Sequence, residues 1–140
     1  MMTPERSDTR RREHARVRVI STDAAPNPVA AYSQGIEAGG VVYTAGQLGV
    51  SPGTGSFPDG IEAQTHAALA NVRTIVEAAG LDVTDIVKVT VFLTDMAQFD
   101  AMNAVYKRFF DGHKPARSTV GVKELPRPAA LVEIDAIAAR

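Results

Sequence analysis

The chain has 140 residues, enough for one domain with its own core, and its 45% hydrophobic and 22% charged residues are an ordinary balance for a globular protein. The lack of cysteine excludes disulfide scaffolds, thiolate nucleophiles and cysteine zinc sites. No apolar run approaches the roughly 20 residues that cross a bilayer, so no membrane partner is expected. A net charge of −1 gives the whole molecule no electrostatic preference for nucleic acid.

The N-terminus is rich in arginine and poor in apolar side chains. Residues 1–18 hold six arginines against three acidic residues, a net +3 that leaves −4 for the rest of the chain. Such a segment buries too little apolar surface to offset the entropy of ordering, so we expect residues 1–16 to be a flexible basic tail and 17–140 to be the domain. A solvated tail is favoured over an RNA-binding arm. No apolar stretch follows the arginines, so no secretory signal is predicted and a cytoplasmic location is expected.

Three strands are predicted in the first part of the domain. Residues 17–20, 32–38 and 41–45 are rich in β-branched and aromatic side chains. The Gly39-Gly40 dipeptide between the second and third predicts a tight turn.

The next segment predicts a loop and then the longest helix. Residues 49–60 hold four glycines and two prolines, as a loop does. Residues 61–79 carry apolar side chains at helical spacing. We expect Asp59 to cap this helix in a capping box with Glu62, and Gly80 to end it. The predicted buried stripe is Ala68, Leu69, Val72, Ile75, Val76 and Ala79.

The last part of the chain predicts a strand, a helix and two further strands. Residues 86–93 are β-branched at most positions, residues 95–110 follow a helical pattern, and residues 118–122 and 131–138 complete the sheet. The fold class is therefore α/β (α+β), a single βββαβαββ domain with a mixed sheet and two helices on one face. The buried face of the second helix is predicted to hold Phe99, Met102, Tyr106 and Phe109.

The two faces of the long strands differ in polarity. We expect two wholly apolar rows to meet the helices: Val87, Val89, Val91 and Leu93 in one strand, and Val132, Ile134, Ala136 and Ala138 in the other. The opposite rows are mixed: Ile86, Lys88, Thr90 and Phe92, and Leu131, Glu133, Asp135 and Ile137. A half-apolar face with no helix left to cover it predicts a homo-oligomer with polar clefts at the subunit junctions.

Common catalytic and ligand-binding motifs are absent. The chain has no GxSxG, HExxH, GxxxxGK[ST] or EF-hand pattern. Its histidines, His14, His66 and His113, have no spacing that suits a shared metal ion, so no metal site is expected.

A charged pair near the C-terminus remains as the candidate for chemistry. Arg117 stands between a proline loop and a strand, where a guanidinium is pre-organised to bind a carboxylate through two hydrogen bonds. Glu133 lies inside an apolar strand, which costs stability unless the carboxylate is paired, wet or at an interface. The pattern leaves two alternatives open: a salt bridge that ties the last two strands together, or a catalytic role.

The C-terminal run PARSTVGVKELPRPAALVEIDAIAA, residues 115–139, resembles the C-terminal motif of the Rid family (RidA, formerly YjgF), also labelled endoribonuclease L-PSP. Residues 31–47 (AYSQGIEAGGVVYTAGQ) and 99–110 (FDAMNAVYKRFF) match further parts of that family. The resemblance implies a chorismate-mutase-like fold and a homotrimer, with helices outside, sheets packed inward and active sites in the clefts between subunits.

The resemblance also implies an activity: hydrolysis of reactive 2-imino acids, or their enamine tautomers, to 2-keto acids and ammonia, with no metal or organic cofactor. Arg117 matches the arginine that grips the substrate carboxylate, and Glu133 the glutamate that activates the attacking water. Tyr32 matches a tyrosine that reaches the site from the neighbouring subunit, while Phe99 and Asn103 match pocket positions on the second helix. Partial burial should raise the pKa of Glu133, opposed by the charge of Arg117.

The chain departs from the family pattern at three places. The family's TSGQ stretch supplies a serine hydroxyl, but here Ala45 stands in its place, so only the backbone amides of Ala45 and Gly46 are expected to contact substrate there. Thr119 falls where many members carry a cysteine. The loop between residues 110 and 115 is short, which would reshape the mouth of the cleft. These changes bear on substrate range more than on reaction type.

Alternative functions remain open. A ribonuclease would need a basic groove, against which the acidic body of the domain argues. A non-enzymatic small-ligand-binding or chaperone-like trimer is favoured by Ala45. A third alternative keeps the deaminase chemistry with a different substrate, such as an aminoacrylate or an aminomuconate.

Overall fold

One mixed sheet and two helices make up the structure, a computed structural model that describes residues 17–140; the predicted tail of residues 1–16 lies outside the described residues. The elements, in chain order, are β1 (Val17–Ile20), β2 (Gly35–Ala38), β3 (Val41–Thr44), β4 (Gln47–Leu48), α2 (Ile61–Ala78), the 3-10 turn η1 (Val83–Asp85), β5 (Ile86–Leu93), the 3-10 turn η2 (Met96–Gln98), α3 (Phe99–Phe110), β6 (Ala116–Gly121) and β7 (Val132–Ala139).

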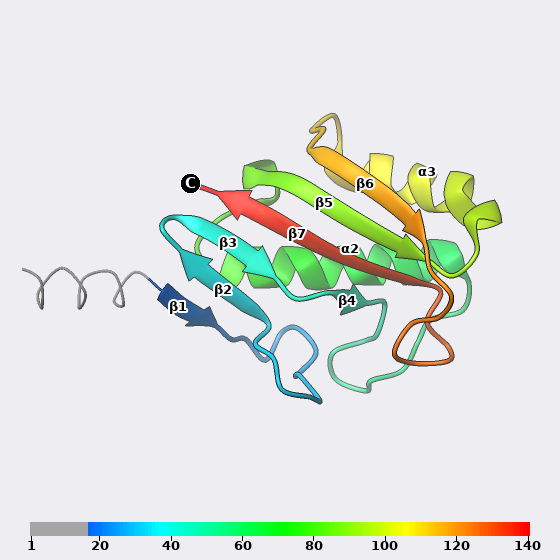
Figure 1. Cartoon of the computed structure of the whole chain (residues 1–140), viewed down its shortest axis with the longest axis horizontal. Coiled ribbons are helices and arrows are strands. Elements are labelled where there is room, and N and C mark those ends of the chain that lie inside the picture. The colour runs from blue at the N-terminus through cyan, green and yellow to red at the C-terminus, as the bar shows by residue number, and fades with distance from the viewer. Residues whose placement is uncertain (1–16) are drawn as a thin grey trace, which may run out of the picture.

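The strands lie in the order β1-β2-β3-β7-β5-β6, and the two-residue β4 pairs with β7. Among the strand pairs of residues 17–140, only β5 and β6 run parallel, and α3 forms the crossover between them; the other pairs are antiparallel (Figure 1). The predicted α/β (α+β) class with a mixed sheet is therefore confirmed. The last strand, β7, takes a central place, so Glu133 lies in the middle of the sheet rather than at an edge.

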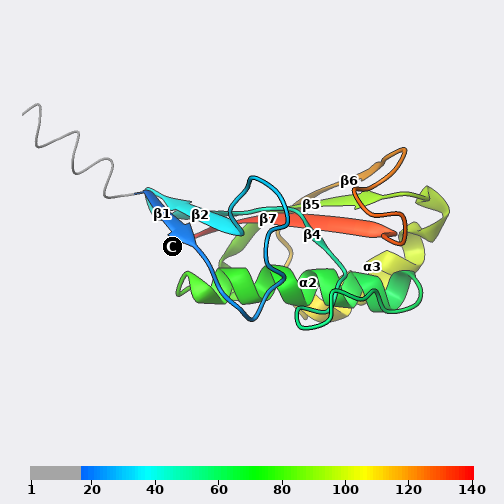
Figure 2. The same ribbon diagram turned by 90° about the horizontal axis from the view of Figure 1, so that it is seen from below.

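Both helices pack on one face of the sheet, as Figure 2 shows from the side. The predicted stripe of α2 is buried, from Ala68 to Ala79, and Met102 and Tyr106 of α3 are buried beside it. Alternate residues of β7 from Val132 to Ala138 complete the core, as predicted. Within residues 17–140, no helix combines the length and apolar character that a membrane crossing requires.

The opposite face of the sheet carries no helix in the described chain (Figure 2). The strand registers place Val19, Ile36, Tyr43 and Ile137 in one row across that face. Val19, on the edge strand β1, is 61% exposed, and Tyr43, on the interior strand β3, is 46% exposed, so large side chains are left uncovered on this face. The predicted half-apolar open face is thus confirmed.

A bulge in β5 corrects one of the predicted rows. The pairing of β5 with β7 shifts between Ile86 and Lys88, so Val87 is an extra residue. Ile86, not Val87, is buried under the helices, and Val87 is half exposed. Strict alternation holds only after the bulge, which is why the prediction for Val89, Val91 and Leu93 is right and that for Val87 is wrong.

The predicted capping of the N-terminus of α2 is also wrong. Gly60, with φ 89°, is the N-cap residue, and no side chain caps this helix, so Asp59 and Glu62 form no capping box. A residue with positive φ directs the chain into the helix at an angle that a capping aspartate does not adopt. At the other end Gly80 has φ 82°, and the predicted left-handed terminator is confirmed.

Three further boundaries differ from the sequence pattern. Strand β6 begins at Ala116 rather than at residue 118, so Arg117 lies inside the strand and not before it. The segment predicted to start a strand at Tyr32 is a loop up to Gln34, whose amide donates to the carbonyls of Thr22, Ala25 and Pro26. Asp95 caps the short η2 turn by accepting from the amide of Ala97, and α3 begins only at residue 99.

Candidate active site

Arg117 lies on the edge strand β6 with its guanidinium fixed by α3. Its register partner is Val89, a residue buried under the helices, so the arginine side chain faces the helix layer. Nη1 donates to Oδ1 of Asn103 at 2.7 Å, and the guanidinium carbon lies 4.5 Å from the ring centre of Tyr106 and 5.5 Å from that of Phe99. One hydrogen bond and two ring faces hold the cation, while its other N–H groups stay available for an anion.

The partners of Arg117 come from a single helix face. Phe99, Asn103 and Tyr106 are spaced at i, i+4 and i+7 on α3, which places them in one line toward β6. Burial raises the pKa of the Tyr106 hydroxyl, opposed by the charge of Arg117, so this ring stays neutral. Tyr106 is predicted from sequence only as a core residue, and its stacking on Arg117 is the contact that sequence reasoning missed.

Thr119 is two residues beyond Arg117 on β6 and therefore faces the same side. Its Oγ1 is buried and has no hydrogen-bond partner among the described residues. Buried hydroxyls normally have a partner, so this oxygen is free to bind a ligand or a neighbouring chain. Phe99, Asn103, Arg117 and Thr119 together are called the arginine cluster below.

Glu133 occupies the open face of the sheet. Its register partners are Phe92 on β5 and Leu48 on β4, and the residues on either side of it in β7, Val132 and Ile134, are buried beneath the helices. Burial raises the pKa of the Glu133 carboxyl, and the nearby charge of Asp135 raises it further. The predicted effect of burial is confirmed. Within one chain the neighbouring charge is a second carboxylate, and the opposition from Arg117 stays a prediction for an assembly that brings another copy's arginine near.

Asp135 is itself held in a polar group on the open face. Burial raises its pKa, while a hydrogen bond from Thr90 and the charge of Lys88 lower it. Lys88 donates to Oγ of Ser118 at 2.8 Å, so the group continues to β6. Asp135 was predicted to share a face with Glu133, but its charge coupling to that residue was missed.

The carboxylate of Glu133 lies directly against the backbone of Gly46. A Cβ atom at Gly46 would be 2.8 Å from both Cδ and Oε1 of Glu133. The segment between β3 and β4 therefore admits only glycine at this position if the carboxylate is to keep its place. Of the two backbone amides predicted to contact substrate, that of Ala45 donates to the carbonyl of Gln34 at 2.8 Å. The amide of Gly46 does not take part in that bond.

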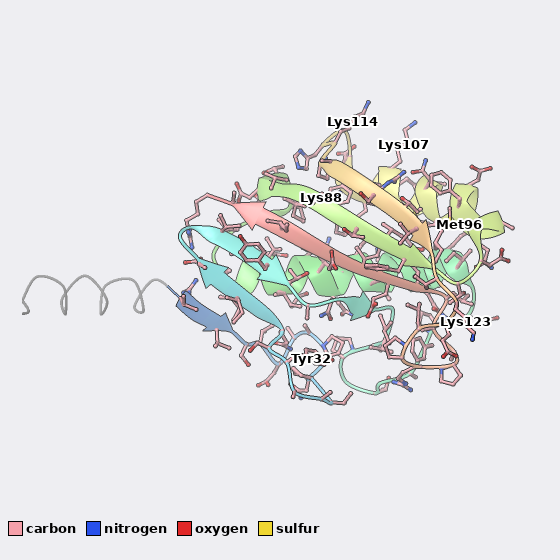
Figure 3. The ribbon with its side chains drawn as sticks, in the orientation of Figure 1. Tyr32, Lys88, Met96, Lys107, Lys114 and Lys123 are labelled. Atoms are coloured by element: carbon pink, nitrogen blue, oxygen red, sulfur yellow. The ribbon has the colours of Figure 1, made fainter. Side chains whose placement is uncertain are left out.

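Tyr32 lies on the same side of the molecule as Gly46. It is 49% exposed, and the two residues line one shallow cavity of about 190 Å³ together with Val50 and Arg127. Figure 3 shows Tyr32 beside the loop before β2, far from the start of β6. Tyr32, Ala45, Gly46 and Glu133 are called the glutamate cluster below.

The structure thus brings the eight predicted site residues into two clusters rather than one. Arg117 and Glu133 point to opposite faces of the sheet, and β5 lies between their strands. Within residues 17–140 no ion pair joins Arg117 to a carboxylate, so the salt-bridge alternative is not realised in this chain. No group of three or more His, Asp or Glu side chains in the same range is placed to hold a metal ion.

The two-helix mixed sheet with its open face is that of a small α+β domain of the chorismate-mutase-like class. The family model described as "Endoribonuclease L-PSP" matches residues 22–140. The chain belongs to this family, which is the Rid family that its sequence motifs resemble.

Named relatives agree with this assignment. The chain is 47% identical over 126 residues to the "Putative reactive intermediate deaminase TdcF" of Escherichia coli, covering 88% of this chain and 97% of that protein. It is 46% identical over 126 residues to the "2-iminobutanoate/2-iminopropanoate deaminase" of the same organism, covering 88% and 98%. A crystal structure of E. coli TdcF with bound serine superposes with a TM-score of 0.85 at 46% identity, covering 88% of this chain and 98% of that one.

Proposed function

We propose that this protein hydrolyses reactive 2-imino acids, or their enamine tautomers, to 2-keto acids and ammonia. Its family and the deaminase names of its relatives support the reaction class. The observation that carries the proposal is the presence, in one chain, of a guanidinium held by Asn103 and a carboxylate, Glu133, whose pKa is raised by burial. These are the two groups that hydrolysis of an imino acid needs.

Arg117 supplies the binding of the substrate. A 2-imino acid carries a carboxylate next to its electrophilic carbon, and a guanidinium binds a carboxylate through two parallel hydrogen bonds. Because stacking on Tyr106 and the bond to Asn103 fix the plane of the guanidinium, the bound acid has one orientation. Holding the imine in this way replaces a bimolecular search with a fixed geometry.

Glu133 supplies the proton transfer. The carboxylate accepts a proton from water as the water oxygen bonds to the imine carbon and the C=N π electrons move to nitrogen. The protonated glutamate then returns this proton to nitrogen, which gives a carbinolamine. Glu133 next takes the proton of the new hydroxyl group and passes it to the nitrogen, and as the C=O bond forms the C–N bond breaks and ammonia leaves. A pKa raised by burial and by Asp135 makes the carboxylate a stronger base than a solvated glutamate.

We further propose a cytoplasmic homotrimer in which each active site joins two subunits. Arg117 and Glu133 of one chain face opposite sides of its sheet, so they meet only if the arginine cluster of one copy meets the glutamate cluster of the next. The exposed row of Val19, Tyr43 and their neighbours supports this assembly, because it offers apolar surface to another copy. A head-to-tail contact of this kind forms a closed ring when the rotation between successive copies closes after three, as the proposed trimer requires.

A coupled assay tests the reaction. A dehydratase generates 2-iminobutanoate in place, semicarbazide traps it, and hydrolysis by the protein competes with trapping. We expect the wild-type protein to divert the imine to keto acid and Arg117→Ala to lose that effect. If the wild-type protein does not accelerate hydrolysis, the proposed reaction is wrong. RNA cleavage that survives Arg117→Ala would favour the ribonuclease alternative.

Mixed oligomers test the shared site. Arg117→Ala and Glu133→Gln chains are each expected to be inactive, but co-refolding them creates junctions where an intact Arg117 meets an intact Glu133. Random mixing in equal amounts restores roughly a quarter of the wild-type sites in a closed ring. If both groups worked within one chain, no activity would return.

A further inference from the structure

A cavity of about 470 Å³ lies between the C-terminal end of α3 and the start of β6. Its wall includes Arg117 and Asn103, so it opens from the arginine cluster toward the end of the helix. Neither the proposed reaction nor the predicted site residues make use of its far end, which is lined by Lys107, His113 and Lys114.

The cavity is positively charged. Lys107, Lys114 and Arg117 line it, and none of its lining residues is acidic. Figure 3 shows Lys107 and Lys114 side by side, with their amino groups projecting to the same side beyond the start of β6. Two carboxylates near the cavity lie outside its wall: Asp111 is exposed in the turn, and the charge of His113 contributes to lowering the pKa of Asp82.

The turn after α3 holds this arrangement in place. Asp111 and Gly112 have φ angles of 46° and 91°, which reverse the chain at once after the helix. His113 then donates its amide to the carbonyl of Phe110 at 3.0 Å, and its Nε2 lies 2.7 Å from the carbonyl oxygen of Ile86. Because His113 is tied to β5, the backbone of Lys114 is held beside the cavity, and its exposed side chain extends from the rim.

The cavity is larger than a small imino acid requires. 2-Iminobutanoate has about seven heavy atoms, which take up roughly 200 Å³ at the volume that each water molecule occupies in the liquid. A molecule of that size bound at Arg117 leaves part of this cavity unfilled in the single chain. A longer substrate with a polar end fills it better, and the charge of the far end selects a negative group.

We propose that this cavity is a second anion subsite of the same active site. Arg117 binds the carboxylate next to the reacting carbon, and Lys107 and Lys114 bind a second anionic group, a carboxylate or a phosphate, at the far end of the substrate. The preferred substrates are therefore dianionic imino or enamine acids. This inference rests on the proposed function, because it extends the site in which Arg117 holds the substrate.

The positive charges of the cavity have an alternative explanation, and other residues of the chain serve as controls that distinguish it from the proposed subsite. Lys107 and Arg108 both lie in the last turn of α3, where cations offset the partial negative charge of the helix end. Arg108, however, lines a different groove, between α2 and α3. Arg108→Ala is therefore a matched control for Lys107→Ala, and Lys123→Ala, which removes an exposed loop lysine, is the control for Lys114→Ala.

Calorimetric titration of two keto acids of equal chain length, 2-oxopentanoate and 2-oxopentanedioate, tests the subsite on the full-length protein. We expect the dicarboxylate to bind roughly tenfold more tightly than the monocarboxylate. Lys107→Ala and Lys114→Ala should each reduce this preference severalfold, and the double variant should abolish it. Arg108→Ala and Lys123→Ala should keep it. Inorganic phosphate as a competitor distinguishes the two anions, since stronger displacement by phosphate than by acetate indicates a phosphate-bearing substrate.

Equal affinity for the two keto acids would overturn the subsite, and so would an equal loss in all four single variants, which would reflect general charge attraction. Hydrolysis of 2-iminobutanoate, which has no second anion, is measured in parallel. Its acceleration without any preference for the dicarboxylate would refute the subsite and leave the proposed function intact. Absence of both would refute the two together.

Discussion

Arg117 and Glu133 face opposite sides of one sheet, and β5 lies between the strands that carry them. The two charges therefore neither neutralise nor position each other within a chain. Each has its own neighbours: Asn103 and the rings of α3 hold Arg117, and the side chain of Glu133 packs close to the backbone of Gly46. This separation makes the function of each residue testable without disturbing the other.

Replacing Arg117 with lysine is expected to lower kcat/KM by roughly 10- to 100-fold, although the positive charge is kept. Lysine cannot form the paired hydrogen bonds of a guanidinium, and a bond to a charged group contributes about 1.5–3 kcal/mol. The measurement is the coupled assay over a range of substrate concentrations. Turnover equal to that of the wild-type protein would remove Arg117 from the binding of the carboxylate.

Glu133→Gln is expected to lower kcat by roughly 10²- to 10⁴-fold, because the amide has the shape of the carboxylate but cannot accept the proton. Thermal stability should stay the same or rise, since the substitution removes the repulsion of Asp135. Single-turnover hydrolysis and thermal unfolding are measured on the same preparation. A marked drop in melting temperature with turnover intact would mean that Glu133 is a structural residue.

The same pair of carboxyls predicts a pH dependence of stability. Glu133 and Asp135 both have raised pKa values, so the folded chain keeps protons that the unfolded chain has lost. Their stabilising contribution to the free energy of unfolding is fully present below the ordinary carboxyl pKa, near pH 4. It is lost as the pH rises through the higher pKa values of the folded state. Urea unfolding across this range should show the wild-type protein losing stability relative to Glu133→Gln. A difference that stays constant with pH would contradict the shift.

Gly46→Ala is expected to reduce activity far more than stability. The new Cβ would lie 2.8 Å from the end of the Glu133 side chain, which is flexible enough to move aside but then leaves the position required for proton transfer. Gly53→Ala is the control, because a Cβ there meets nothing within 4 Å. Steady-state kinetics and melting temperature compare the two variants; equal activity in both would show that the carboxylate does not need its present place.

Tyr43→Glu is expected to prevent assembly while the chain still folds. Tyr43 is already 46% exposed in the single chain, so a charge there costs little until another copy covers it. His66→Glu, on the exposed surface of α2, places the same charge on the helix side. Light scattering after gel filtration gives the mass, and circular dichroism reports folding. A Tyr43→Glu protein of wild-type mass would show that this face is not the subunit interface.

The long elements could be predicted from the sequence because their patterns are strong. The stripe of α2 and the alternation of β7 each repeat over several periods, and both are confirmed. The bulge at Val87 and the two-residue β4 were not predictable, since one extra residue or one pair of residues carries no periodicity. The cap at Gly60 was missed because a positive φ depends on the direction in which the preceding loop enters the helix.

The candidate site was predictable as a set of residues but not as an arrangement. The residue pattern singled out Arg117 and Glu133 as a charged pair, the family resemblance supplied their roles, and the alternation of β7 placed Glu133 opposite the core. The face of Arg117, in contrast, depends on the parallel register between β5 and β6, which a crossover through α3 determines and no local pattern encodes. Residues such as Tyr106 acquire their contact with Arg117 only through that register.

When the two halves of an active site lie on opposite faces of one sheet, catalysis requires assembly and therefore depends on the concentration of the chain. If the proposed assembly is right, a newly made or isolated chain holds all the residues of the site and yet has no complete one. Under the proposed assembly, activity per chain is zero at high dilution and rises steeply through the concentration range in which the ring forms. Dilution therefore inactivates the protein reversibly without an inhibitor. Ligands that bridge two copies shift the same equilibrium toward the ring.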